Sequence, residues 1–232
     1  MVFVPDDRLS ARLYAVDVSA LEHDGLYAAA YRAVSDERRE KADRFRFRKD
    51  RNLSIGAGLL LQYALRQAGM TQAPVFCFGA NGKPYLQNRP DLFFSLSHSG
   101  HFALCAVSGA QIGCDIEQVS RCELALAKRF FTAGEYAAIA AQPTLQAQTD
   151  RFYRIWTLKE SFLKCTGLGL QLPLHEFEIT ADAQAIRIRQ QVDVRSFRLQ
   201  CFDELPGYQC ALCEAEGTGE TQPEILPLHE LL

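Results

Sequence analysis

The sequence has no long apolar segment and lacks the common nucleotide-binding and hydrolase motifs. No run approaches the ~20 apolar residues that span a bilayer, and the N-terminus has no basic region followed by an apolar core, as a secretory leader would. The absence of G-x-x-x-x-G-K-[ST] and G-x-G-x-x-G argues against P-loop and Rossmann sites. The absence of G-x-S-x-G argues against a serine hydrolase. We therefore expect a cytoplasmic protein that does not bind membranes.

The chain also lacks a strong excess of charge of either sign. Its net charge of −3 argues against a dedicated nucleic-acid binder. Basic residues are nevertheless concentrated between Arg32 and Arg51, where acidic residues are interleaved with them. This pattern predicts a solvated helix face for most of the stretch, with some arginines left to hold phosphates.

Cysteines are present, but they follow no repeated spacing. Of the eight, only Cys210 and Cys213 form a C-x-x-C, and this lies in a strand-like run rather than at a helix start, where a redox pair is expected. No second pair is available to complete a zinc site. The cysteines are therefore interpreted as buried, reduced thiols of a cytoplasmic protein.

Hydrophobic periodicity predicts helices and strands in both halves of the chain. Helices are expected over 36–47, 50–68, 136–141 and 146–165, and strands over 13–18, 74–78, 93–96, 102–107, 113–117, 176–180, 185–188, 194–201 and 208–214. Each half runs from helices to β-ribbon, and residues 100–106 faintly echo residues 207–213. The pattern predicts an α+β fold of two similar lobes, 1–110 and 111–232, with a ligand cleft near the seam. Residues 223–232 are expected to be loosely attached.

Two short segments carry most of the chemistry. In an extended strand over 113–117, Asp115 and Glu117 share one face. In the helix, Trp156, Glu160 and Lys164 recur every four residues on one stripe. If the stripe faces the strand, three carboxylates and an ammonium surround one point, and oxygen donors without His or Cys favour Mg²⁺ or Mn²⁺ over zinc. The alternatives are a half-exposed edge strand and a surface Glu160–Lys164 pair.

A second group of residues could hold phosphates. Lys83 follows an Asn-Gly turn, His98 is expected in a Ser-His-Ser-Gly loop, and Arg44 and Arg51 flank a helix start. A single loop histidine is more often structural, but together these cations and loop amides suit several phosphate oxygens.

Six motifs, in order over about residues 40–170, resemble the Sfp-type 4′-phosphopantetheinyl transferases. They are Arg44–Arg51 with the following Leu-rich helix, Asn81–Pro84, Phe94–His98, Gly113–Glu117, Arg129–Glu135, and Trp156–Lys164 closed by Gly167-x-Gly169. Gly-x-Asp-x-Glu with Trp-x-x-Lys-Glu-x-x-x-Lys is the hallmark of that family. The chain length fits the two-lobed, single-chain, monomeric type rather than the shorter trimeric carrier-protein synthases.

The resemblance implies a reaction and a role for each residue. The enzyme would transfer 4′-phosphopantetheine from coenzyme A to a serine hydroxyl of an apo acyl or peptidyl carrier protein and release 3′,5′-ADP. Asp115, Glu117 and Glu160 would bind Mg²⁺, Glu160 would also be the general base, and Lys164 would neutralise the reacting phosphate. The nucleotide end of coenzyme A would be held by Arg44, Arg51, Lys83, Ser97 and His98. The acidic carrier would meet the basic stretch 38–51 or Lys128 and Arg129.

Two other interpretations stay open at this point. The same carboxylates could serve a different Mg²⁺-dependent phosphoryl or nucleotidyl transferase. A non-enzymatic module could instead use the basic stretch to bind nucleic acid, although the net charge and the lack of interleaved exposed aromatic residues argue against it.

Overall fold

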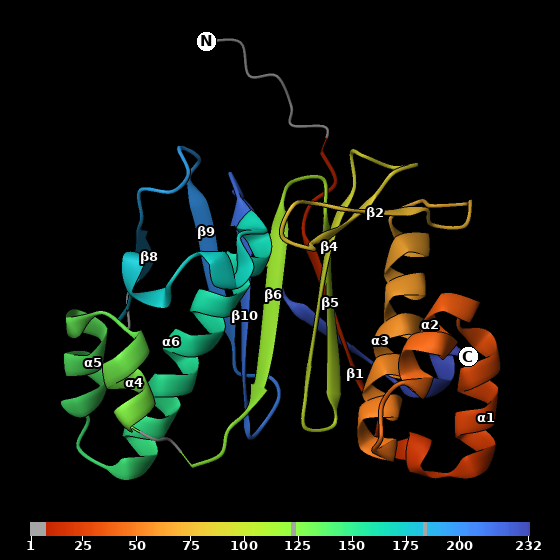
Figure 1. Cartoon of the computed structure of the whole chain (residues 1–232), viewed down its shortest axis with the longest axis horizontal. Coiled ribbons are helices and arrows are strands. Elements are labelled where there is room, and N and C mark those ends of the chain that lie inside the picture. Colours follow the sequence, from red (N-terminus) through yellow and green to blue (C-terminus); the bar gives the residue numbers. More distant parts are fainter. Residues whose placement is uncertain (1–7, 122–123, 183–184) are drawn as a thin grey trace.

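The computed structural model describes residues 8–121, 124–182 and 185–232, which form two α+β lobes joined along a central seam (Figure 1). This confirms the predicted fold class. The first lobe contains β1 (Arg12–Asp17), α1 (Asp24–Ala33), α2 (Asp36–Asp43), α3 (Arg48–Gln67), β2 (Phe76–Phe78), β3 (Pro84–Leu86), β4 (Phe93–Ser99) and β5 (Phe102–Ser108). The second contains β6 (Ile112–Gln118), α4 (Leu124–Phe130), α5 (Ala133–Ala140), α6 (Leu145–Thr166), β7 (Glu178–Ala181), β8 (Ile186–Arg189), β9 (Phe197–Phe202) and β10 (Tyr208–Ala215). The last strand, β11 (Pro223–Leu226), returns to the first lobe.

Local sequence signals fix several helix ends. The Ser35 hydroxyl accepts the Arg38 N–H at the start of α2. Helix α5 opens with a capping box, in which Thr132 and Glu135 each bond the other's backbone N–H, so it begins at Ala133 rather than at residue 136 as expected. Gly167 ends α6 in the left-handed region at φ 72°.

Two sheets face each other across the seam, and the helices cover their outer sides (Figure 1). The first sheet has the order β11-β1-β5-β4 and the second β6-β10-β9. Strand alternation divides each strand between two cores. In β1, Tyr14 and Val16 pack with the helices of the first lobe, whereas Leu13 packs with Ile116 and Leu212 of the second sheet between the lobes.

Serine hydroxyls connect the sheets where β4 and β6 meet. These strands are neighbours in space but belong to different sheets. The Oγ atoms of Ser95, Ser97 and Ser99 on β4 accept the backbone N–H groups of residues 114, 116 and 118 on β6, at 3.1, 3.4 and 3.0 Å. The seam is therefore bonded by alternate side chains of β4, which all point to β6.

The C-terminal segment differs from the expectation of loose attachment. Strand β11 pairs in parallel with β1, and a short 3₁₀ helix follows at Leu228–Leu231. Leu226 and Leu231 are buried in the first lobe's core, and the C-terminus lies beside its helices (Figure 1). Burial of these leucines supplies the attachment that local sequence does not reveal. The division of the chain into 1–110 and 111–232 stays a prediction.

The remaining expectations concern cysteines and membranes. Cys210 and Cys213 lie in β10 as buried, free thiols, as predicted, whereas Cys122 falls outside the described residues. The expectation of burial is wrong for Cys77, which is exposed, and holds only in part for Cys201, which is half-buried. Within the described part of the chain, no helix is both long enough and apolar enough to cross a bilayer.

Candidate active site

One face of β6 explains why an acidic pair can approach a helix so closely. Gly113, Asp115 and Glu117 alternate on the face that α6 covers. A Cβ atom at Gly113 would lie 2.1 Å from the Ser161 carbonyl oxygen and 2.3 Å from the Cys165 nitrogen. Only glycine permits this contact, which brings α6 against β6 beside the two carboxylates.

Helix α6 presents Glu160 and Lys164 to these carboxylates, as its stripe pattern predicts. Lys164 Nζ lies 2.7 Å from Asp115 Oδ1 in an ion pair. The neighbouring Lys159 points away and is fully buried, with Nζ at 2.7 Å from Glu135 Oε1 and hydrogen bonds to the Leu174 and Phe177 carbonyls. The face of α6 that carries Lys159 is thus fixed by a buried, fully hydrogen-bonded ion pair, while the face that carries Glu160 and Lys164 lies against β6.

Asp115 is the centre of a hydrogen-bond network. Its Oδ1 accepts the Ser97 hydroxyl at 2.8 Å and the Lys164 ammonium, while its buried Oδ2 has no protein partner among the described residues. Glu117 Oε2 accepts the Ser99 hydroxyl at 2.9 Å. A buried carboxylate oxygen without a donor is costly unless a cation or substrate group satisfies it.

The electrostatics of the site favour an additional cation. Burial raises the pKa of Glu117 and of Glu160, and the charge of Asp115 raises both further. Lys164 opposes this shift for both glutamates. Burial alone would lower the pKa of Lys164, but the nearby anions, Asp115 first, outweigh it and the pKa is raised. Three acidic groups therefore share one ammonium.

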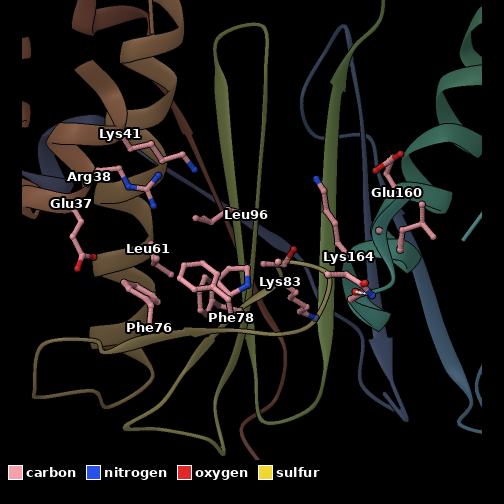
Figure 2. A pocket seen from close by; sticks show the side chains of 18 of the residues that line it. Glu37, Arg38, Lys41, Leu61, Phe76, Phe78, Lys83, Leu96, Glu160 and Lys164 are labelled. Atoms are coloured by element: carbon pink, nitrogen blue, oxygen red, sulfur yellow. Dashed lines mark hydrogen bonds between the residues drawn. The ribbon is translucent and has the colours of Figure 1, made fainter. Parts of the chain in front are cut away.

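Two adjoining cavities open onto this cluster. The smaller, of about 360 Å³, is lined by all three acidic residues with His98, Trp156 and Lys164. The larger, of about 550 Å³, has an apolar wall that includes Phe76, Phe78 and Leu96. Figure 2 shows the larger cavity between Arg38 and Lys41 on one side and Glu160 and Lys164 on the other. Together they offer an acidic end, basic edges and an apolar wall.

The predicted phosphate-binding residues separate into two groups. Ser97 and His98 line the acidic cavity. His98 lies in β4 rather than in the expected loop, because residues 98 and 99 still pair with Phe102 and Ala103 of β5. Partial desolvation in the cavity, and then Lys164, lower the pKa of His98.

Lys83 lines the larger cavity, but its ammonium is engaged elsewhere. Its Nζ donates to the carbonyls of Ile112 at 3.2 Å and Cys165 at 2.8 Å, both in the second lobe. Asn81 from the same turn donates to the Gly167 carbonyl at 3.1 Å. The turn between β2 and β3 thus joins the first lobe to the C-terminal end of α6.

Neither Arg44 nor Arg51 is among the residues that line these two cavities. Arg44 is exposed at the end of α2, and Arg51 donates to the Phe45 carbonyl at 2.8 Å. Arg38 and Lys41, from the same basic stretch, line both cavities and were not predicted as site residues. Their spacing of three in a helix is the signal that could have found them. Partial desolvation in the cavity lowers the pKa of Lys41, and Arg38 lowers it further, as expected for two adjacent cations.

The acidic residues are suitable ligands for a hard divalent cation, because they line one cavity and Asp115 Oδ2 has no hydrogen-bond partner among the described residues. Among the described residues, no group of three His, Cys, Asp or Glu side chains forms a ready-made metal cluster. Mg²⁺, however, usually keeps several waters and is bound by a few carboxylates together with substrate phosphates, rather than by a complete cage of protein ligands. The unpartnered Asp115 Oδ2, beside two carboxylates with raised pKa, meets that description.

Comparison with known proteins identifies similar sequences over most of the chain. The family model described as 4′-phosphopantetheinyl transferase superfamily matches residues 111–213, and the one described as 4′-phosphopantetheinyl transferase, N-terminal, matches residues 22–110. A 4′-phosphopantetheinyl transferase of Bacillus subtilis is 36% identical over 201 residues, covering 85% of this chain and 88% of that protein. The 4′-phosphopantetheinyl transferase Sfp of Bacillus subtilis (strain 168) is 33% identical, covering 86% of this chain and 90% of that protein. The structure of a holo-(acyl-carrier-protein) synthase from Bacillus anthracis aligns with 47% of this chain and 97% of its own, at 18% identity and a TM-score of 0.40.

Proposed function

The chain belongs to the 4′-phosphopantetheinyl transferase family, and on that premise we propose how this site performs the transfer. The enzyme moves the 4′-phosphopantetheine group of coenzyme A to a serine hydroxyl of an apo acyl or peptidyl carrier protein. The observation that carries the site assignment is the meeting of Asp115, Glu117, Glu160 and Lys164 around one cavity.

Glu160 is the proposed general base. Its raised pKa gives the carboxylate a higher affinity for a proton than an ordinary glutamate. It removes the proton of the carrier serine, whose oxygen attacks the phosphorus that bears the pantetheine. The bond from this phosphorus to the bridging oxygen breaks, and 3′,5′-ADP leaves with that oxygen. Because the nucleophile comes from the partner, the chain needs no serine–histidine set of its own.

Asp115, Glu117 and Glu160 are the proposed Mg²⁺ ligands. When bound, the ion offsets the charge of the pyrophosphate and polarises the reacting phosphoryl group. Lys164, held at the edge of both cavities by Asp115, supplies positive charge to the same group.

Coenzyme A has further phosphates, which need cations outside the acidic cluster. Arg38 and Lys41 line both cavities, and His98 lines the acidic one. The pKa of His98 is lowered by partial desolvation in the cavity, and then by Lys164, Lys41 and Arg38, so these groups lie close enough to repel one another. We assign this cationic edge to phosphate binding, with Lys83 fixing the cavity wall. Arg44 and Arg51 are then secondary candidates.

The carrier protein is proposed to dock on α4. Leu126 and Phe130 of this helix are exposed beside Lys128 and Arg129. The adjoining Phe131 contacts Trp156, which lines the acidic cavity, with ring centroids 6.2 Å apart. An acidic helical partner on this surface would place its serine near Glu160.

Charge reversal of the docking surface tests this assignment. Lys128→Glu with Arg129→Glu should raise the KM for the carrier and reduce its dependence on salt, with little change in the KM for coenzyme A. Arg187→Glu on the exposed face of β8 is the matched control. Unchanged carrier KM and salt dependence in the double variant would remove α4 from the docking surface.

Intact-mass spectrometry tests the function directly. Several apo carriers are incubated with the protein, coenzyme A and Mg²⁺, and at least one should gain the mass of one phosphopantetheine as 3′,5′-ADP appears. The reaction should stop when EDTA removes the divalent ion. A panel of acyl and peptidyl carriers with no mass gain would overturn the proposal.

A further inference from the structure

Ser97 and Ser99 of β4 each form two hydrogen bonds to β6. One is to a carboxylate, and the other is to the backbone N–H of the residue that follows that carboxylate in the sequence. Ser97 Oγ donates to Asp115 Oδ1 at 2.8 Å and accepts the N–H of Ile116 at 3.4 Å. Ser99 Oγ donates to Glu117 Oε2 at 2.9 Å and accepts the N–H of Gln118 at 3.0 Å. Both serines belong to β4 of the first lobe, and both carboxylates belong to β6 of the second.

This bonding gives each hydroxyl a direction. A serine hydroxyl has one proton to donate and lone pairs to accept. Because the serine oxygen accepts the peptide N–H of β6 with a lone pair, the hydroxyl proton is free to point to the carboxylate. Each carboxylate is thereby tied to the first lobe, and its rotamer is linked to the docking of β4 on β6.

The third serine of the series provides a built-in comparison. Ser95 Oγ accepts the N–H of Cys114 at 3.1 Å, which repeats the seam contact. The position matching Asp115 and Glu117 is Gly113, which has no side chain to hold. The Ser95 hydroxyl therefore contacts the backbone of β6 but no carboxylate, whereas the Ser99 hydroxyl contacts both the backbone of β6 and the carboxylate of Glu117.

We propose that Ser99, and Ser97 with it, is a positioning residue that orients the carboxylates of β6 for the divalent cation, so that the first lobe completes the metal site of the second. The inference rests on the proposed function, because it takes Asp115 and Glu117 as the metal ligands. Partners of metal ligands in other proteins typically change metal affinity 10- to 100-fold when they are removed.

The test compares Ser99→Ala with Ser95→Ala. Mn²⁺ binding is measured by electron paramagnetic resonance in the presence of coenzyme A, together with the Mg²⁺ dependence of transfer and the thermal midpoint. Ser99→Ala should weaken Mn²⁺ binding by about tenfold or more and raise the Mg²⁺ concentration needed for half-maximal rate. Both variants lose one seam hydrogen bond, so they should lower the thermal midpoint by similar amounts. Ser95→Ala, however, should leave Mn²⁺ affinity within about twofold of wild type.

A second pair of variants separates the hydroxyl from packing. Thr and Val have nearly the same shape, but only Thr keeps the hydroxyl, so Ser99→Thr should retain Mn²⁺ affinity that Ser99→Val loses. Equal Mn²⁺ affinity in these two variants, or equal losses in Ser99→Ala and Ser95→Ala, would overturn the inference. A wild-type protein that does not bind Mn²⁺ with coenzyme A would instead refute the metal ligands of the proposed function.

Discussion

Glu160 occupies a position where a negative charge is disfavoured by its surroundings. Burial and the charge of Asp115 both raise its pKa, and Lys164 acts against them. Such a carboxylate binds a proton, or a cation in its place, more readily than an exposed glutamate does. At the scale of the residue, the same environment therefore suits both proposed roles of Glu160.

Glu160→Gln should remove the base without removing its volume. We expect kcat for transfer to fall by about 10²- to 10⁴-fold, and further if a metal ligand is lost as well. The thermal midpoint should not fall, because a neutral amide relieves the repulsion by Asp115. Rates come from carrier mass gain with time, and stability from circular dichroism. Transfer at the wild-type rate in a folded Glu160→Gln variant would rule out Glu160 as the base.

The contact of α6 with β6 determines whether the site can form at all. Asp115 and Glu117 come from one element and Glu160 and Lys164 from the other, and Gly113 sets the distance between them. The buried pair of Lys159 and Glu135 fixes the rotation of α6 from behind. The active site thus depends on the packing of two elements as much as on its four polar residues.

Gly113→Ala should disturb that packing. The added methyl group would lie 2.1 Å from a backbone oxygen of α6, so the helix has to move. We expect the free energy of unfolding to fall by about 1–3 kcal/mol. The transfer rate of the folded protein should fall as well, because Glu160 moves away from Asp115. Urea denaturation and the mass assay measure the two effects.

Gly25→Ala is the matched control for this substitution. Gly25 lies in helix α1, and its Cβ would meet no atom within 4 Å. Stability should rise by about 0.4–1 kcal/mol with unchanged transfer. If Gly113→Ala proves as harmless as Gly25→Ala, the close approach of α6 does not shape the site.

Elements with strong local signals were predictable, and those fixed by distant contacts were not. Apolar periodicity identified α3 and α6, whereas α5 begins at Ala133 rather than at the expected residue 136, because its capping box includes the first turn. The turn-like composition around His98 suggested a loop, but β4 continues there because residues 98 and 99 pair with β5. The spacing of Arg38 and Lys41 places them on one face of α2, but the direction in which that face points depends on how α2 packs in the lobe.

At the scale of the whole molecule, Lys83 is a charged link between the lobes. It comes from the turn of the first lobe and donates to carbonyls of Ile112 and Cys165 in the second. Burial lowers its pKa from 10.5 to about 8. The folded protein therefore releases this proton at lower pH than the unfolded chain does.

The sign of the resulting pH dependence follows from linkage. Below about pH 8 both states carry the charge, and the full desolvation penalty applies to the folded state. Between about pH 8 and 10.5 the unfolded chain binds more protons at Lys83, so this residue's contribution to stability rises with pH. We expect the free energy of unfolding of wild type relative to Lys83→Met to increase between pH 7.5 and 9.5 in urea denaturation. A difference that stays constant or falls with pH would contradict this description of Lys83.

The pairing of β11 with β1 has a consequence for the nascent chain during translation. The strand made first acquires its outer neighbour only when residues 223–226 have left the ribosome. Until then the nascent first lobe presents a bare row of peptide groups along β1, open to any other extended chain. Translation that stalls just before residue 223 should therefore yield polypeptides prone to aggregate, although all of the proposed catalytic residues are already made.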